Sequence, residues 1–114
     1  GKSYGSFVAI KVLKGLEGKV TNKLLILMGV PLTSLTPEQH EEYKYITGNT
    51  YPVYVIQNRK DPYGDAQTVF DYLKDAKFTP FLMESDTHAY TYPDKVIDCK
   101  IIWLDRGTIV NVEI

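Results

Sequence analysis

The chain has 114 residues, of which 44% are hydrophobic and 24% are charged, and its formal net charge is −1. This length and composition are typical of one globular domain, and they exclude a disordered, fibrous or membrane-embedded chain. The longest apolar run, residues 24–30, is far shorter than the roughly 20 residues that cross a bilayer. We therefore expect a single domain over residues 1–114 that makes no contact with a membrane.

The first half of the chain predicts two strands and one helix. Hydrophobic residues alternate over 7–14, which favours a strand, and the short apolar run over 24–28 favours a second, buried strand. A capping box with proline at the first helical position begins at Thr36, so we expect a helix from there to about Thr47.

The second half predicts one helix and several strands. Residues 51–57 are rich in β-branched and aromatic side chains and favour a strand. After a turn that contains Asp61, Asp65 can cap a helix whose apolar stripe extends to about Lys77. We expect a strand over 79–84 and a further one over 87–92.

The C-terminal segment predicts a β-hairpin. Residues 95–104 and 108–114 both alternate between apolar and polar side chains, and they flank a turn that contains Gly107. Together, the elements predict an α+β fold with one mixed or mainly antiparallel sheet of five to seven strands, packed by two helices. An exposed edge strand of the hairpin would allow the protein to form a homodimer.

Cysteine and glycine positions limit the chemistry that we expect. The only cysteine, Cys99, cannot form an intramolecular disulfide, which indicates a reducing, cytoplasmic compartment. The glycines do not have the spacing of a dinucleotide-binding loop, and Gly1-Lys2-Ser3 lacks the upstream glycine of a phosphate-binding loop. We recognise no complete kinase, zinc or hydrolase signature, and we expect no cofactor and no metal.

Of the two histidines, His88 is the candidate for catalysis. His40 lies on the expected first helix without the second histidine of a zinc motif, so we expect it to be solvated. Glu84, Asp86 and His88 occupy alternate positions, and in an extended segment they would place an imidazole beside two carboxylates. This arrangement could provide a general base or bind a metal; the alternative is an exposed polar sheet edge.

Tyrosine is abundant, with nine residues in the chain. Because its ring offers a large apolar face with a polar tip, tyrosine is enriched at recognition surfaces. The sequence therefore predicts a non-catalytic module that binds another protein, such as an accessory or inhibitor protein that masks a partner's surface. The predicted binding residues are Tyr43, Tyr45, Tyr51, Tyr54, Tyr63, Tyr90 and Tyr92. The alternative is that these rings half-bury on sheet faces.

Two other functions remain open from the sequence. The first is a small-molecule or metal-dependent enzyme centred on His88. The second is a single-stranded nucleic-acid binder that uses the N-terminal lysines Lys11, Lys14, Lys19 and Lys23. The net charge and the scarcity of arginine argue against nucleic acid as the partner.

Overall fold

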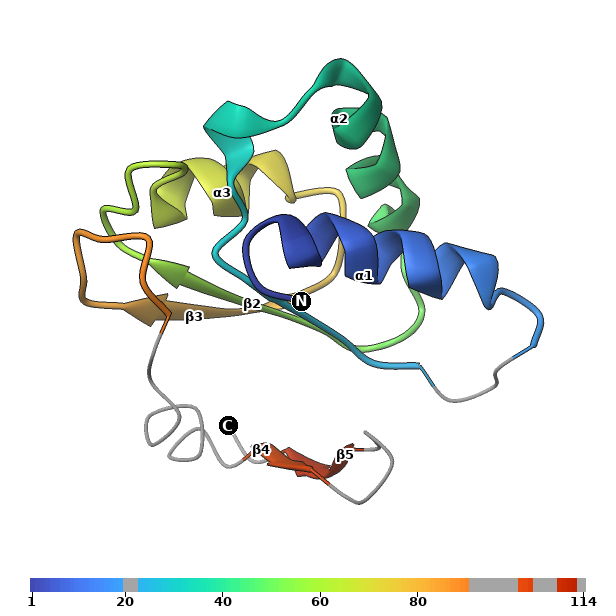
Figure 1. The fold of residues 1–114 in the computed structure, drawn as a ribbon. Helices are drawn as coiled ribbons and strands as arrows, with labels where there is room; N and C mark the ends of the chain where they lie inside the picture. The colour runs from blue at the N-terminus through green and yellow to red at the C-terminus, as the bar shows by residue number, and fades with distance from the viewer. Residues whose placement is uncertain (20–22, 91–100, 104–108, 113–114) are drawn as a thin grey trace.

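The computed structural model describes residues 1–19, 23–90, 101–103 and 109–112. Its main sheet contains three parallel strands in the order β1-β2-β3 (Figure 1). The strands are β1 (Leu25–Met28), β2 (Val53–Asn58) and β3 (Thr79–Met83). The expectation of five to seven mixed or antiparallel strands is therefore wrong. Helices connect the strands, and such crossover connections produce parallel pairing.

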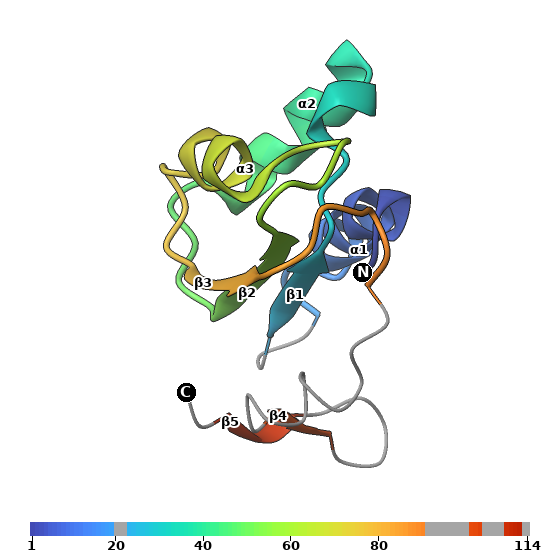
Figure 2. The ribbon, with the colours of Figure 1, turned by 90° about the vertical axis from the view of Figure 1, so that its left-hand side faces the viewer.

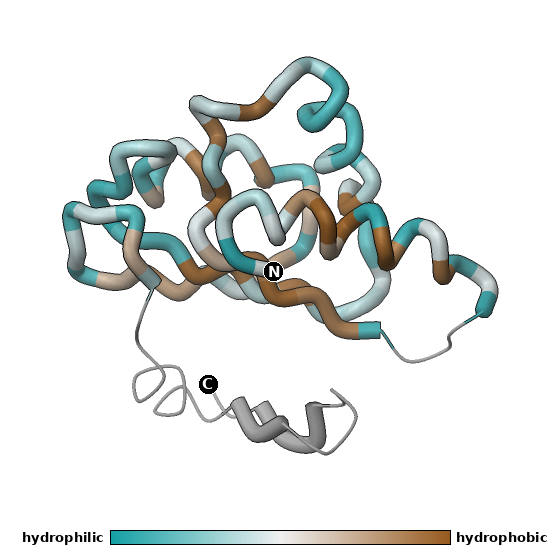
Figure 3. The backbone as a smooth tube through the Cα atoms, viewed as in Figure 1, coloured by the Kyte–Doolittle hydropathy of each residue, from teal (hydrophilic) through white to brown (hydrophobic). Residues whose placement is uncertain are grey.

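Three α-helices lie on the same side of this sheet, as Figures 1 and 2 show. They are α1 (Tyr4–Gly15), α2 (Pro37–Tyr43) and α3 (Ala66–Tyr72), with short 3-10 helices η1 (Leu32–Ser34) and η2 (Lys44–Ile46). A core of buried side chains fills the space between helices and sheet, and hydrophobic stretches of the chain converge there (Figure 3). Its members include Ile10, Leu25, Leu27, Tyr43, Ile46, Val53, Val55, Val69 and Leu73.

The strand expected over residues 7–14 is part of helix α1. Ile10 is completely buried, whereas Val8 and Val12 are 53% and 55% exposed. On a helix, positions 8 and 12 lie on one face and position 10 lies on the opposite side. The alternating hydrophobic residues of this segment therefore do not share one face, and the pattern that favours a strand is misleading here.

The other predicted helices and strands of residues 24–84 are confirmed, with shifted ends. Thr36 and Gln39 form the expected capping box at the start of α2, which ends at Tyr43 and continues into η2. The Asp65 carboxylate accepts a hydrogen bond from the Thr68 N–H, at 3.0 Å, and caps α3. This interaction holds the pKa of Asp65 below its usual value.

The C-terminal part of the chain is described only in pieces. Residues 87–90 do not form the expected strand, and residues 91–92 lie outside the described residues. Further on, β4 (Ile101–Trp103) pairs antiparallel with β5 (Ile109–Val112), as expected for the two arms of the hairpin. Cys99 and Gly107 lie outside the described residues. Within the described ranges, no helix is both long enough and apolar enough to span a membrane.

Residues 1–3 run parallel to β1 before the chain enters α1. Lys2 forms a parallel bridge with Met28. The Met28 N–H donates to the Gly1 carbonyl at 2.9 Å, and the Ser3 N–H donates to the Met28 carbonyl at 2.8 Å. The chain therefore changes from a strand-like pairing to a helix at Ser3. This change occurs at the carboxyl end of β1, the edge of the sheet at which α/β proteins place their ligands.

Candidate active site

Ser3 occupies the turn between the pairing with β1 and helix α1. Its φ of 54° and ψ of −127° make it the one non-glycine residue with positive φ in the part of the chain that the structure describes. Such a conformation costs about 1–3 kcal/mol and is concentrated at functional sites. A side chain on Gly1 would place its Cβ 2.1 Å from the Gly5 carbonyl oxygen, so this tight turn requires glycine at position 1.

Asp61 lies in the loop that follows β2, and its carboxylate is fully buried. Oδ1 accepts a hydrogen bond from the Tyr63 N–H at 2.8 Å. Oδ2 accepts one from the Tyr90 hydroxyl at 2.7 Å. A buried carboxylate is costly unless hydrogen bonds compensate for the lost water, and these donors provide that compensation. They also fix the orientation of the Asp61 carboxylate.

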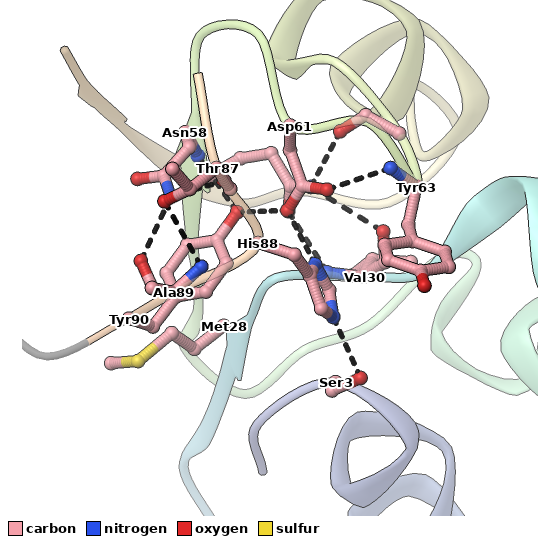
Figure 4. Close-up of polar contacts among 12 residues, drawn as sticks. Ser3, Met28, Val30, Asn58, Asp61, Tyr63, Thr87, His88, Ala89 and Tyr90 are labelled. Carbon is pink, nitrogen blue, oxygen red and sulfur yellow. Dashed lines mark hydrogen bonds and ion pairs between the residues drawn. The ribbon is translucent and has the colours of Figure 1, made fainter. Parts of the chain in front are cut away.

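His88 lies in the loop that follows β3 and joins Asp61 to Ser3 (Figure 4). Its Nδ1 is 2.7 Å from Asp61 Oδ2, and its Nε2 is 2.8 Å from Ser3 Oγ. A carboxylate only accepts hydrogen bonds, so the tautomer that fits Asp61 carries its proton on Nδ1. In this tautomer Nε2 is an acceptor for the Ser3 hydroxyl. The three side chains form a continuous hydrogen-bonded chain from a buried carboxylate to a hydroxyl.

Asn58, the last residue of β2, holds the loop that carries His88. Its side-chain Nδ2 donates to the carbonyls of Thr87 and Ala89, at 2.8 and 3.0 Å. Its backbone N–H donates to the Tyr90 hydroxyl at 2.9 Å. Hydrogen bonds on both sides of His88 thus restrain its backbone. A catalytic imidazole requires this kind of support to keep its geometry.

The hydroxyl of Tyr90 should contribute strongly to stability. Tyr90→Phe removes the donor to Asp61 and the acceptor for the Asn58 N–H, and both groups are buried. We expect the free energy of unfolding, measured by urea denaturation, to fall by about 2 kcal/mol. Tyr54→Phe is the control, because it deletes a hydroxyl from a half-buried ring on β2, and we expect a change below about 0.5 kcal/mol. Equal losses in the two variants would contradict the role assigned to Tyr90.

The structure separates the carboxylates that the sequence analysis places beside His88. Glu84 forms a two-pronged ion pair with Arg59, with nitrogen to oxygen distances of 2.6–3.0 Å, and this hydrogen bonding lowers the pKa of Glu84. Asp86 is exposed to solvent. His40, which was expected to be solvated, is instead half-buried, and its Nδ1 lies 2.8 Å from the Tyr72 hydroxyl. The carboxylate partner of His88 is Asp61.

The seven tyrosines predicted to bind a partner lie in different environments. Tyr43 and Tyr90 are buried, whereas Tyr63 is 46% exposed. The half-buried members are Tyr45, Tyr51 and Tyr54, and Tyr92 lies outside the described residues. Of the six that the structure describes, Tyr63 and Tyr90 have rings close to the imidazole of His88. Protein binding by this set stays a prediction.

The N-terminal lysines lie on α1 or beyond its end. Lys14 forms an ion pair with Glu42 at 3.6 Å. The Lys11 ammonium lies over the ring of Phe7, and that of Lys23 lies over the ring of Tyr51. Lys19 is exposed. Binding of single-stranded nucleic acid by these lysines also stays a prediction.

Sequence reasoning missed two members of the site, Ser3 and Asp61. Residues 1–5 read G-x-S-x-G, a pattern typical of a serine nucleophile on a tight turn between a strand and a helix. This pattern indicates a nucleophile only when a helix follows the serine directly. Because a strand was expected over residues 7–14, the pattern was not interpreted in this way. Asp61 has no comparable local signal. Its role becomes visible only when the loops after β2 and β3 are brought together.

The site has the parts of an activated nucleophile. His88 is placed to accept the proton of Ser3, while Asp61 orients the imidazole and stabilises its protonated form. Among the described residues, no group of three or more histidine, cysteine, aspartate or glutamate side chains is arranged to hold a metal ion. Comparisons with protein-family models, curated proteins and solved structures found no match. The interpretation of the site therefore depends on its geometry.

Proposed function

We propose that the protein is a serine hydrolase that cleaves esters through a covalent acyl-enzyme on Ser3. The observation that carries this proposal is the hydrogen-bonded chain Ser3–His88–Asp61, with distances of 2.8 and 2.7 Å. A serine hydroxyl, an imidazole base and a buried carboxylate in this order are the groups that acyl transfer requires. This proposal extends the hypothesis of an enzyme centred on His88. It adds acyl transfer as the reaction class and Ser3 and Asp61 as the partners of His88.

In the proposed reaction, Ser3 Oγ attacks the carbonyl carbon of the ester while its proton moves to His88 Nε2. The bond between the acyl carbon and the leaving oxygen then breaks, and His88 returns the proton to the departing alcohol. A water molecule next gives a proton to His88 and attacks the acyl carbon. The bond between this carbon and Ser3 Oγ then breaks, and His88 returns the proton to Ser3 Oγ, which releases the acid and restores the hydroxyl. Asp61 stays ionised throughout and stabilises the imidazolium that forms in each step.

The start of α1 supplies a donor for the negative charge that develops on the carbonyl oxygen. Tyr4 is the first residue of α1, so its backbone N–H has no acceptor within the helix. This N–H directly follows the nucleophile, and the positive end of the helix dipole reinforces it. A backbone donor in this position stabilises the oxyanion of the tetrahedral intermediate.

The order of the three residues along the chain supports an enzyme of the α/β-hydrolase type. In such enzymes the serine stands between a strand and a helix, and the acid and the histidine follow later in the chain. Here the order is Ser3, Asp61 and His88, and each residue follows a segment of parallel pairing: residues 1–2, β2 and β3. The cytoplasmic location expected from the single cysteine is part of this proposal.

The test of this proposal is covalent labelling with a fluorophosphonate, which reacts with activated serines. We expect one adduct, located on Ser3 by mass spectrometry of peptides. Labelling should disappear in Ser3→Ala and in His88→Ala. Ser34→Ala is the matched control, since it keeps the backbone carbonyl that accepts from the Tyr4 hydroxyl, and that variant should label at the rate of the unmodified protein. Absence of an adduct on Ser3 would refute the hydrolase assignment.

A further inference from the structure

We propose that Tyr63 forms the wall of a leaving-group subsite, and that the preferred substrates are esters whose alcohol portion is a flat aromatic group. This inference rests on the proposed function and deepens it. The ring of Tyr63 lies beside the imidazole of His88, as Figure 4 shows, with 4.7 Å between ring centroids and 56° between ring planes. The residue is 46% exposed, so the site presents an aromatic surface to solvent.

The backbone of Tyr63 is fixed on both sides. Its N–H donates to Asp61 Oδ1 at 2.8 Å. Its carbonyl accepts from the N–H and the hydroxyl of Thr33, at 2.9 and 3.0 Å, and Thr33 belongs to η1. These bonds hold the residue between Asp61 and the segment that follows β1. The backbone beneath the ring is therefore already ordered in the free protein. Because binding does not have to order it, less entropy is lost when substrate binds.

The chemistry of acyl transfer identifies which part of the substrate meets this ring. His88 Nε2 must reach Ser3 Oγ during attack and the leaving oxygen during its departure. The alcohol portion of the ester therefore lies against the imidazole, on which the Tyr63 ring is packed. Aromatic rings interact favourably in stacked and edge-to-face arrangements. An aromatic alcohol portion is thus the group that this surface would bind best.

The test compares two esters with the same acyl group, 2-naphthyl acetate and ethyl acetate. Both form the same acetyl-enzyme, so any difference in kcat/KM arises before the alcohol has left. In Tyr63→Ala, we expect kcat/KM for 2-naphthyl acetate to fall roughly tenfold more than kcat/KM for ethyl acetate. Tyr63→Phe keeps the ring and should keep the preference of the unmodified protein.

An equal fall for both esters in Tyr63→Ala would overturn the subsite, because it would show that the ring only supports His88. Unchanged kcat/KM values for both esters would overturn it as well. The fluorophosphonate separates this failure from failure of the proposed function, since its leaving group is a fluoride ion that makes no use of an aromatic surface. If Ser3 of Tyr63→Ala is labelled normally while the ester ratio is unchanged, the hydrolase assignment stands and the subsite does not.

Discussion

Asp61→Asn should lower kcat for ester hydrolysis by about four orders of magnitude and leave the fold intact. Asparagine has nearly the shape of aspartate, so the neighbours of the buried side chain keep their places. It carries no charge, however, and its amide no longer selects the tautomer in which His88 Nδ1 is protonated and Nε2 accepts from Ser3. The initial rate of 2-naphthyl acetate hydrolysis at saturating substrate measures this loss.

The matched control for this prediction is Asp65→Asn, which makes the same replacement four residues along the chain. Asp65 caps α3 and is exposed, and asparagine is also a good capping residue. We expect kcat of this variant to stay within about twofold of the unmodified protein. If Asp61→Asn retained more than a tenth of kcat, Asp61 would not be the third member of the proposed triad.

Gly29→Ala should have the largest effect on stability, with a fall of about 4 kcal/mol in the free energy of unfolding. Gly29 follows β1 with a φ of 66°, a conformation that strains any residue with a side chain. Its Cβ would also lie 2.4–2.9 Å from three atoms of the Tyr90 ring. Because the hydroxyl of that ring donates to Asp61, ester hydrolysis should fall as well.

Gly48→Ala separates the two causes of this destabilisation. Gly48 has a similar φ of 71°, but a Cβ at this position would meet no atom within 4 Å. We expect a fall of about 1 kcal/mol from backbone strain alone, without loss of activity. Urea denaturation followed by circular dichroism measures both variants. A similar fall in the free energy of unfolding for the two variants would show that the contact of the new Cβ with Tyr90 does not destabilise the Gly29 variant.

Local sequence signals predict most of the helices and strands correctly, but they do not predict the number of strands in the sheet or their direction. The capping residues Thr36 and Asp65 and the apolar segments around them depend on neighbours in sequence, and these elements are confirmed. The segment over residues 7–14 is ambiguous because apolar residues at positions 8, 10 and 12 fit a strand pattern and also occur on a helix. The predicted order of strands and helices over residues 24–84 is typical of parallel pairing, but the strands expected after residue 84 favoured a mixed or antiparallel sheet.

The candidate site depends on contacts between residues far apart in the sequence. His88 was identified as a candidate, but its partners Asp61 and Ser3 are 27 and 85 positions away. Glu84 is close to His88 in sequence, but its carboxylate forms an ion pair with Arg59 and not with His88. Only the parallel arrangement of the strands brings the loops after them to one edge. Of the two residues that the sequence analysis missed, Ser3 has a local signal, the G-x-S-x-G pattern, and Asp61 has none.

In the proposed enzyme, the hydrogen bond between Ser3 and His88 would make the reactivity of the serine depend on the position of the His88 loop. It joins the first turn of the described chain to the loop after its third strand, across 85 positions. Loops of this kind open locally at a lower free energy than the sheet beneath them. A transient opening of residues 86–90 would remove the base from the nucleophile while the core stays packed. If Ser3 is labelled as proposed, the rate of labelling should follow the population of the closed loop, which unfolding curves of the whole domain do not report.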